Sequence, residues 1–577
     1  MKRNAFLAGM TALLLGLNSV NVLAEQGTPP EPPSGDMGGT PPDMPGGAPP
    51  EGGGGFGGAN TQTYDYSGTL SGTLTADAET LESDGEDITS DTSDVVAALA
   101  SNGGTLTITN SALNKSGDDN DGDACNFYGV NAIALSVNDG SMLVISDSTL
   151  NADSVGSNAI FATDNAIAYA NNVEITTSAD NSRGLDATYG GTIIGKDVII
   201  TTQGDHCAAT ATDRGGGNIS VVNGTFETNG SGSPLIYSTG DIEVSNVTGT
   251  ATGSQIAGME GLNTILINNS DLTSTITQAT ASDPVANGII LYQSTSGDAE
   301  TSTGNTAVFQ AVDSKLTSSI ASGAMFYVTN TNVNVLLENS EVNFDSNDAN
   351  LFYIAGNNSN NWGSAGSNGA NVTFSAISET LNGNIIVDTI SSIDAYLLEN
   401  TTYTGAIGIE TNDVNTKTTD APATMNIDST SKWIVTGNST VTNLNVEEGG
   451  EIVDESGNVV TITVNGETVV EGTSEYTVTV TSAYSNEVTL TEANEIIENN
   501  IDRSEFEAMF EDVAEVEATP ETEENTVEEE TTNESETIEE VEEVTEEKTT
   551  NNTGIIVGGV AVVAIAAIVI LRKVKKS

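Results

Sequence analysis

Four residues have the types and positions that could do chemistry in this chain: Arg183, His206, Asp213 and Arg214. In a polysaccharide lyase, an arginine or lysine abstracts the proton next to a uronate carboxylate, beside acidic residues that bind calcium. Asp186 lies close to these residues in the sequence and adds a carboxylate. The cluster therefore predicts a ligand site, with three interpretations. It is a lyase-like centre, a contact for a glycan or carboxylate, or a set of polar side chains satisfied at the surface.

One short acidic segment supplies the candidate metal ligands. They are Asp118, Asp119, Asp121 and Asp123. Ca²⁺ prefers oxygen ligands, and carboxylates provide them. The segment departs from the EF-hand pattern, because counting back from Gly122 puts Gly117 at the first ligand position and Tyr128 at the twelfth. A loose calcium site and a solvated acidic turn are the two interpretations, and no other cofactor is expected.

Trp362 lies in a long polar insertion, residues 357–369, which we expect to project from the repeating part of the chain. An exposed ring could stack on a sugar, whereas a buried ring would pack the insertion onto the protein.

These residues must be positioned by a repeat, in which an alternating apolar run leads to an Asn or Asp, a small residue and a further apolar residue. The anchors are Asn110, Asp147, Asn172, Asp197, Asn223, Asn246, Asn269, Asp313, Asn339 and Asn400. From Asp147 to Asn269 their spacing is 23 to 26 residues, a period typical of solenoids. The repeat predicts that Arg183 and His206 share a column on adjacent coils. It gives the Asn and Asp anchors a structural role, in which their side chains hydrogen-bond along the turns.

The register of the repeat predicts which residues face the core. Residues two and four positions before an anchor are apolar, as in Leu106 and Ile108 or Val335 and Leu337, so the period is two and each run is a strand. No segment within the repeats has helical periodicity. The chain is therefore predicted to be all-β, a right-handed parallel β-helix, the hand following from the crossover preference.

Charge and cysteine content limit the partners. The chain has 15 basic and 82 acidic residues, a formal charge of −67, which argues against nucleic acid. Cys125 and Cys207 lie about three coils apart in the predicted register, too far for a disulfide. We expect both thiols to be unpaired.

The ends of the chain predict export and anchoring. The predicted segments are a signal peptide (1–24), a Pro/Gly-rich linker (25–62), the β-helix (63–446), a small β cap or module (447–490) with a turn at Asn465-Gly466, a short helix (491–510), an acidic disordered stalk (511–553), a single transmembrane helix (554–571) and a basic cytoplasmic tail (572–577). The apolar run followed by Arg and Lys places the C-terminus inside and the rod outside. A sortase signal is the alternative, but Thr550 and Asn551 stand where such a signal has Leu-Pro.

Several phrases resemble those of adhesin-like surface proteins of host-associated anaerobic microbes. They are NFYGVNA (126–132), DRGGG (213–217), LYQSTSGDA (291–299), MFYVTNT (325–331) and WGSAGSNGA (362–370). The resemblance implies a pectate-lyase-like β-helix at the cell surface that contacts glycans or surface proteins of host or neighbouring cells. Together with the residues it predicts a membrane-anchored, non-catalytic adhesin or glycan-binding protein. The alternatives are a calcium-dependent uronan lyase and a structural surface-layer component.

Overall fold

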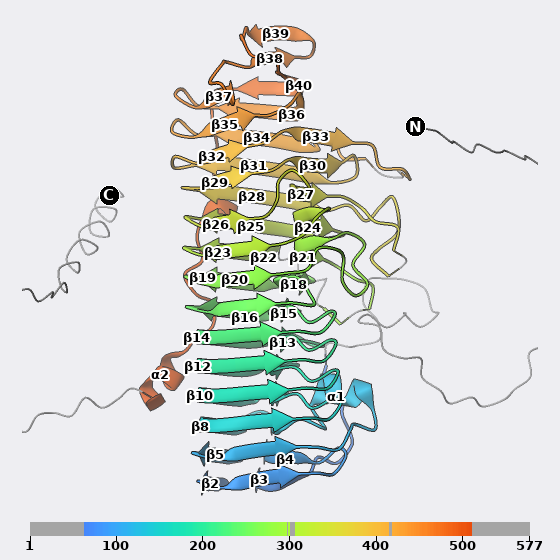
Figure 1. The fold of residues 1–577 in the computed structure, drawn as a ribbon, viewed down its shortest axis with the longest axis vertical. Helices are drawn as coiled ribbons and strands as arrows, with labels where there is room; N and C mark the ends of the chain where they lie inside the picture. Colours follow the sequence, from blue (N-terminus) through green and yellow to red (C-terminus); the bar gives the residue numbers. More distant parts are fainter. Residues whose placement is uncertain (1–62, 297, 300–305, 360, 415–417, 511–577) are drawn as a thin grey trace, which may run out of the picture. The chain divides into compact units, whose positions relative to one another are not determined.

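The computed structural model describes residues 63–296, 298–299, 306–359, 361–414 and 418–510. These residues form a parallel β-helix whose coils stack along one axis (Figure 1), as the sequence predicts. The predicted signal peptide, linker, stalk, transmembrane helix and basic tail lie outside the described residues. In the described part, no helix combines the length and the apolar character needed to span a membrane. The right hand of the coil stays a prediction.

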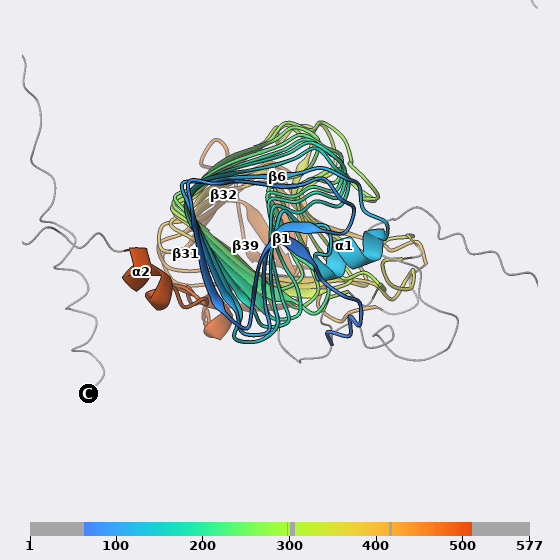
Figure 2. The ribbon, with the colours of Figure 1, turned by 90° about the horizontal axis from the view of Figure 1, so that it is seen from below.

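Each coil contributes strands to three faces around the core, which Figure 2 shows end-on. Face A is a 13-stranded sheet: β1 (Gly72–Asp77), β4 (Val96–Ser101), β7 (Ala134–Val137), β9 (Ile160–Thr163), β11 (Leu185–Ala187), β13 (Thr210–Thr212), β15 (Ile236–Ser238), β18 (Ala257–Glu260), β21 (Asn287–Tyr292), β24 (Ala324–Thr329), β27 (Asn350–Ile354), β30 (Ile385–Asp388) and β33 (Ile407–Glu410).

Face B follows face A in each coil. Its strands are β2 (Thr80–Asp84), β5 (Thr105–Thr109), β8 (Met142–Ala152), β10 (Ile167–Thr177), β12 (Gly191–Thr202), β14 (Gly217–Thr228), β16 (Asp241–Ser245), β19 (Thr264–Asn268), β22 (Ala307–Val312), β25 (Asn332–Glu338), β28 (Asn371–Ile377), β31 (Ser392–Leu398), β34 (Ala423–Ile427), β36 (Ser439–Val446) and β40 (Thr477–Ser485).

Face C completes the coil, and β8, β10, β12 and β14 pass through the turn from face B into it. Its other strands are β3 (Asp87–Ser90), β6 (Ala112–Lys115), β17 (Thr248–Ala251), β20 (Asp271–Ser274), β23 (Lys315–Ser318), β26 (Glu341–Asn343), β29 (Thr380–Asn382), β32 (Thr402–Thr404), β35 (Lys432–Val435) and β37 (Glu451–Asp454).

The core contains the residues that the alternating pattern predicts. Leu106, Ile108, Val335 and Leu337 have no exposed surface, and their apolar counterparts before the other anchors are buried too. The exception is Asn400, before which Ala395 and Leu397 face the core, one residue earlier than the pattern predicts. The apolar residue that follows each turn, such as Leu113, is buried or partly buried. One continuous cluster of buried apolar side chains therefore connects the coils.

The anchors form the turn between faces B and C. All ten have a positive φ, between 45° and 69°, a conformation that Asn and Asp tolerate better than other side chains. Their side chains also bond from coil to coil: Nδ2 of Asn172 donates to Asp147 at 2.6 Å, and Nδ2 of Asn223 donates to Asp197 at 3.1 Å. The predicted structural role of the anchors is confirmed.

The residue after each anchor forms a second ladder inside the turn. The amide of Ser270 donates to Oγ of Ser314 at 3.1 Å, and the amide of Ser314 donates to Oγ of Ser340 at 3.1 Å. Glu379 takes the next place, and its Oε1 accepts from the Ser340 amide at 2.7 Å. Glu379 is 2% exposed, and its Oε2 has no hydrogen-bond partner among the described residues. A buried carboxyl thus replaces a hydroxyl at the point on face C where the successive strands β26 and β29 do not pair.

Replacing Glu379 with Gln is expected to stabilise the protein at pH 8 by about 1–2 kcal/mol. Burial raises the pKa of Glu379 to about 7, from 4.5 in an exposed glutamate. The folded state therefore holds the proton more tightly, and this contribution to stability is complete below about pH 4.5 and lost as the pH rises through 7. Thermal unfolding between pH 4 and 8 measures the effect: Glu379→Gln should flatten the pH dependence. Glu341→Gln, at an exposed neighbouring position, should not.

The predicted cap is a continuation of the β-helix rather than a separate module. Strand β37 pairs with β35 on face C, and β40 pairs with β36 on face B. Beyond them, β38 (Thr461–Val464) and β39 (Glu467–Val470) form a hairpin through Asn465 and Gly466, the predicted turn, which have φ of 52° and 85°.

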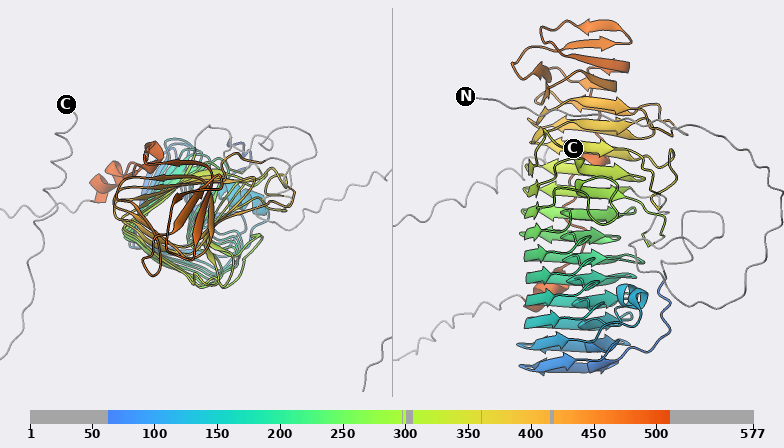
Figure 3. Two further views of the ribbon diagram at one scale, coloured as in Figure 1. Left: turned by 90° about the horizontal axis from the view of Figure 1, so that it is seen from above. Right: turned by 45° about the vertical axis from the view of Figure 1, so that its right-hand side comes forward.

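After β40 the chain turns back along face B as an extended segment, residues 486–510, which we call the strap (Figure 3). Its helical parts are a 3-10 turn, η1 (Glu492–Asn494), and α2 (Ser504–Phe510), so the prediction of a helix over 491–510 is wrong for most of its length. The reason is that backbone amides of the strap donate hydrogen bonds to side chains of face B instead of to carbonyls of a helix. The amide of Ile497 donates to Gln310 at 2.9 Å, and the amide of Ile501 donates to Glu243 at 3.0 Å.

The strap contacts face B at every third residue. Asn494 donates to Ser375 at 2.8 Å, Arg503 donates to the Ser220 carbonyl at 3.0 Å, and Phe506 packs against Tyr169. Three residues of extended chain cover about 9 Å, close to the roughly 9.6 Å between alternate coils. The strap thereby brings the last described residue, Phe510, beside β8, β10 and β12 (Figure 1).

Candidate functional site

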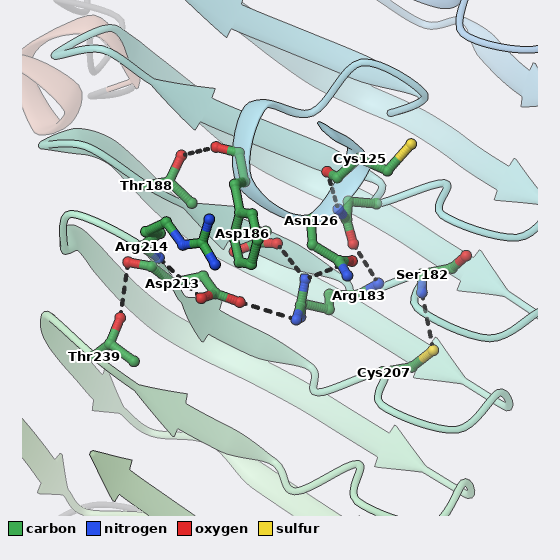
Figure 4. Close-up of polar contacts among 12 residues, drawn as sticks. Cys125, Asn126, Ser182, Arg183, Asp186, Thr188, Cys207, Asp213, Arg214 and Thr239 are labelled. Carbon is green, nitrogen blue, oxygen red and sulfur yellow. Dashed lines mark hydrogen bonds and ion pairs between the residues drawn. The ribbon is translucent and has the colours of Figure 1, made fainter. Parts of the chain in front are cut away.

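The structure brings together three of the five predicted ligand-binding residues, Arg183, Asp213 and Arg214, at the start and end of strands of face A (Figure 4). Arg183 lies between two carboxylates: Nη1 is 3.0 Å from Asp186 and Nη2 is 3.1 Å from Asp213. Arg214 pairs with Asp298 at 2.7 Å. These five residues are the ion-pair cluster.

Burial sets the electrostatics of the ion-pair cluster. Arg183 is 8% exposed and Asp186 is fully buried. Loss of hydration raises the pKa of Asp186 to about 6, although Arg183 opposes the rise. Burial also raises the pKa of Asp213, helped by the negative charge of Asp298. Three carboxyls thus share two guanidinium groups, and Oδ1 of Asp186 has no hydrogen-bond partner among the described residues.

A short helix, α1 (Gly122–Tyr128), covers this cluster. Asn126 accepts from Nη1 of Arg183 at 3.2 Å, and the Phe127 ring lies 3.4 Å from the guanidinium carbon of Arg214. The periodicity analysis missed α1, but the sequence carried its signals. Asp121 caps its N-terminus, and Gly129 follows its C-terminus at a φ of 68°.

Tyrosines pack beside α1. Tyr64 and Tyr66, which precede the first strand, contact the ring of Tyr128, and Tyr128 stacks on Tyr189 with centroids 5.5 Å apart. The hydroxyl of Tyr128 donates to Asp65 at 2.5 Å. These contacts hold residues 64–66 against α1.

His206 does not belong to the ion-pair cluster, contrary to the prediction. Strand pairing aligns Leu185 with Thr210, which places Arg183 over Ala208. His206 aligns instead with Asn181, and both have a positive φ, 59° and 54°. The turn that leads into face A has its own left-handed position, so the predicted register was wrong by two residues.

Trp362 is 5% exposed and stacks on Tyr292, with centroids 4.3 Å apart and rings inclined by 17°. The carbonyl of Trp362 accepts from Asn357 at 3.1 Å. The indole therefore packs the insertion onto the coils, which is the second of the two interpretations, and it is not an exposed sugar-stacking ring.

The four predicted metal ligands lie just before and within α1, where two of them accept hydrogen bonds from backbone amides. Oδ1 of Asp118 accepts from the Val155 amide at 3.0 Å, and Asp121 accepts from the Ala124 amide at 3.3 Å. Asp123 lies in the first turn of α1, and burial raises the pKa of Asp119. Among the described residues, no three His, Cys, Asp or Glu side chains are grouped to hold a metal ion.

Cys125 and Cys207 are both free and buried, as predicted. Sγ of Cys207 accepts from the Ser182 amide at 3.0 Å, and its own amide donates to Ser233 at 2.9 Å. Cys207 thus occupies one step of a serine ladder, and burial raises the pKa of its thiol to about 12.

An open polar groove, which the sequence analysis did not predict, runs along the start of face B and begins beside the ion-pair cluster. A first hollow of about 780 Å³ extends from Gly190 and Gly215 to Asn334. A second, of about 450 Å³, extends from Asn334 to Thr424. Thr306 and Asn334 line both hollows. We call the two together the face B groove.

One column of residues, one per coil, runs along the face B groove, and all but Val308 line it. Strand pairing aligns Asn218, Asp241, Thr264, Val308, Asn334, Thr373, Asp394 and Thr424, and each is half-buried. The strap forms part of one wall, because Asn500 lines the first hollow and donates to Asp241 at 2.9 Å. The signal was partly present in the sequence: the first five lie five residues before the predicted anchor of their own repeat.

Gly217 and Gly240 line the first hollow where neighbouring coils approach closely. A Cβ on Gly217 would lie 2.7 Å from Ala187, and one on Gly240 would lie 2.3 Å from the Gly217 carbonyl oxygen. The close approach of the coils therefore requires glycine at these two positions.

Comparisons with known proteins add no family. No family model matches the sequence, and no curated protein matches it. A solved structure, "The cryo-EM structure of the Vag8-C1 inhibitor complex", aligns over 72% of this chain and 91% of that chain, with 12% identity and a TM-score of 0.26. A likeness at this level carries no argument about activity or partners.

Proposed function

We propose that this protein is a non-catalytic, membrane-anchored cell-surface β-helix protein that binds an extended glycan along the face B groove. The observation that carries the proposal is the column of amide, hydroxyl and carboxylate side chains that repeats on almost every coil. Successive coils lie about 4.8 Å apart, so the column offers hydrogen-bonding groups at a regular interval along a chain. Sugars present hydroxyls that both donate and accept, and Asn, Thr and Asp side chains match them.

The contacts of the ion-pair cluster favour a structural role over catalysis. A lyase needs an arginine or lysine whose nitrogen can reach a substrate proton. The Arg183 guanidinium is held by two carboxylates, and that of Arg214 is paired with Asp298 and stacked on Phe127. A uronan lyase would have to break these buried ion pairs before either residue could act. We therefore assign the ion-pair cluster to holding α1 on face A.

A glycan array probed with the full chain, with calcium and with chelator, tests the proposed function. Asn334→Trp should abolish binding, because Asn334 lines both hollows and a large ring would fill the face B groove. Thr225→Trp, at an exposed position on face C, is the matched control and should bind normally. Absence of binding to any glycan, or equal binding by both variants, would contradict the proposal. Release of unsaturated sugars would point to the lyase instead.

A further inference from the structure

Among the residues that the structure describes, the lining of the face B groove carries negative charge but no positive charge. Its described lining includes Asp241 and Asp394, and none of its lining residues is Lys, Arg or His. The formal charge of the whole chain, −67, has the same sign. An anionic polymer in this groove would therefore meet like charges without a cation to pair with.

Both carboxylates are held in place as acceptors. Asp241 accepts from Asn500 of the strap at 2.9 Å. Asp394 accepts from Asn426 at 2.6 Å and from the hydroxyl of Tyr396 at 3.0 Å. Burial raises the pKa of both carboxyls, and the hydrogen bonds from these neutral donors oppose the rise. Each carboxylate still has lone pairs left for a sugar hydroxyl. The two residues can thus bind hydroxyls and repel acids.

We propose that the face B groove selects uncharged polysaccharides and rejects uronans and other anionic glycans, with Asp241 and Asp394 as the residues that discriminate. This inference rests on the proposed function, since it specifies the ligand of the same groove. Each groove carboxylate that faces a ligand carboxylate at about 4 Å is expected to weaken binding at least about tenfold. A neutral chain of the same linkage avoids this repulsion and gains hydrogen bonds from the same oxygens.

The test compares two hexasaccharides of the same linkage that differ only at C6, a β-1,4-mannan with hydroxymethyl groups and a β-1,4-polymannuronate with carboxylates. The full chain, in about 150 mM salt, should bind the mannan hexamer at least about tenfold more tightly than the mannuronate hexamer. The double variant Asp241→Asn/Asp394→Asn keeps the shape of the groove and removes both charges. It should bind the mannuronate hexamer at least about tenfold more tightly than the wild type does, and so lose most of the discrimination.

A matched control removes two charges elsewhere. Glu174→Gln/Glu227→Gln changes exposed residues on face C, and it should leave the discrimination unchanged. Circular dichroism of each variant confirms that the β-helix is folded. Equal or tighter binding of the mannuronate by the wild type, or discrimination that survives the Asp241→Asn/Asp394→Asn change, overturns the inference and leaves glycan binding intact. Failure of the wild type to bind either hexamer, together with a blank glycan array, overturns the proposed function itself.

Discussion

Replacing Arg183 with Met is expected to destabilise the coils around β11 and β13 by about 3–5 kcal/mol. The guanidinium contacts Asp186, Asp213 and Asn126, and its removal leaves two buried carboxylates without the cation that lies between them. Hydrogen exchange of the β11 and β13 amides, together with thermal unfolding, measures the effect. The loss should be smaller at pH 5 than at pH 8, because protonation removes the repulsion between the two carboxyls.

An exposed ion pair provides the control for Arg183. Lys432 and Glu451 lie 2.7 Å apart on face C, with side chains 39% and 54% exposed. Lys432→Met should cost less than about 1 kcal/mol. Adding Asp186→Asn and Asp213→Asn to Arg183→Met should restore part of the lost stability. An Arg183→Met protein as stable as Lys432→Met would show that the ion-pair cluster does not hold the coils.

Replacing Phe506 with Ala is expected to release the end of the strap, at a cost of about 3–5 kcal/mol. Phe506 is fully buried in a cluster with Val144, Tyr169 and Ile194. Because these partners belong to the outside of face B, the coils themselves should remain folded. Limited proteolysis and hydrogen exchange between residues 497 and 510 should detect the released segment, while the unfolding of the coils is nearly unchanged.

Met509 is the matched control on the same helix, since its side chain is 49% exposed. Met509→Ala should leave proteolysis of the strap unchanged. If Phe506→Ala also leaves it unchanged, the hydrogen bonds of Gln310 and Glu243 hold the strap without the aromatic contact. If it unfolds the coils, the strap is part of the core rather than a cover.

The coils could be predicted from the sequence because each coil repeats the same local pattern. Leu106 and Ile108 face inward, and Asn110 turns the chain, for reasons that lie within five residues of one another. Register between neighbouring turns was less certain, since the turn into face A tolerates Gly156, Asn181, His206 or Gly232. Because several residue types occupy this turn position, the sequence does not show which residues share a column there. This explains why His206 was assigned to the wrong column.

The strap and the face B groove could not be predicted in the same way. The strap bonds to residues 119 to 308 positions away, such as Ser375 and Gly195, and no local period encodes such a contact. The apolar spacing of Ile496, Ile497 and Ile501 suited a helix equally well. The groove needs both the column on face B and the strap as its wall, so it becomes visible only when the two are placed together. Trp362 is similar, because its burial depends on Tyr292 from another coil.

The direction of the strap determines how the protein responds to mechanical tension. The strap runs from β28 toward β10, so a force on Phe510 that points back toward the hairpin of β38 and β39 breaks its contacts one after another, from Phe506 to Asn494. A force in the opposite direction loads the same contacts in parallel, as shear, and they resist it together. Complete peeling of residues 486–510 would free a segment with a contour length of roughly 80 Å, while the hydrogen bonds between the strands of faces A, B and C remain intact. In a molecule that is held at both ends, the strap would therefore detach and lengthen before the coils unfold.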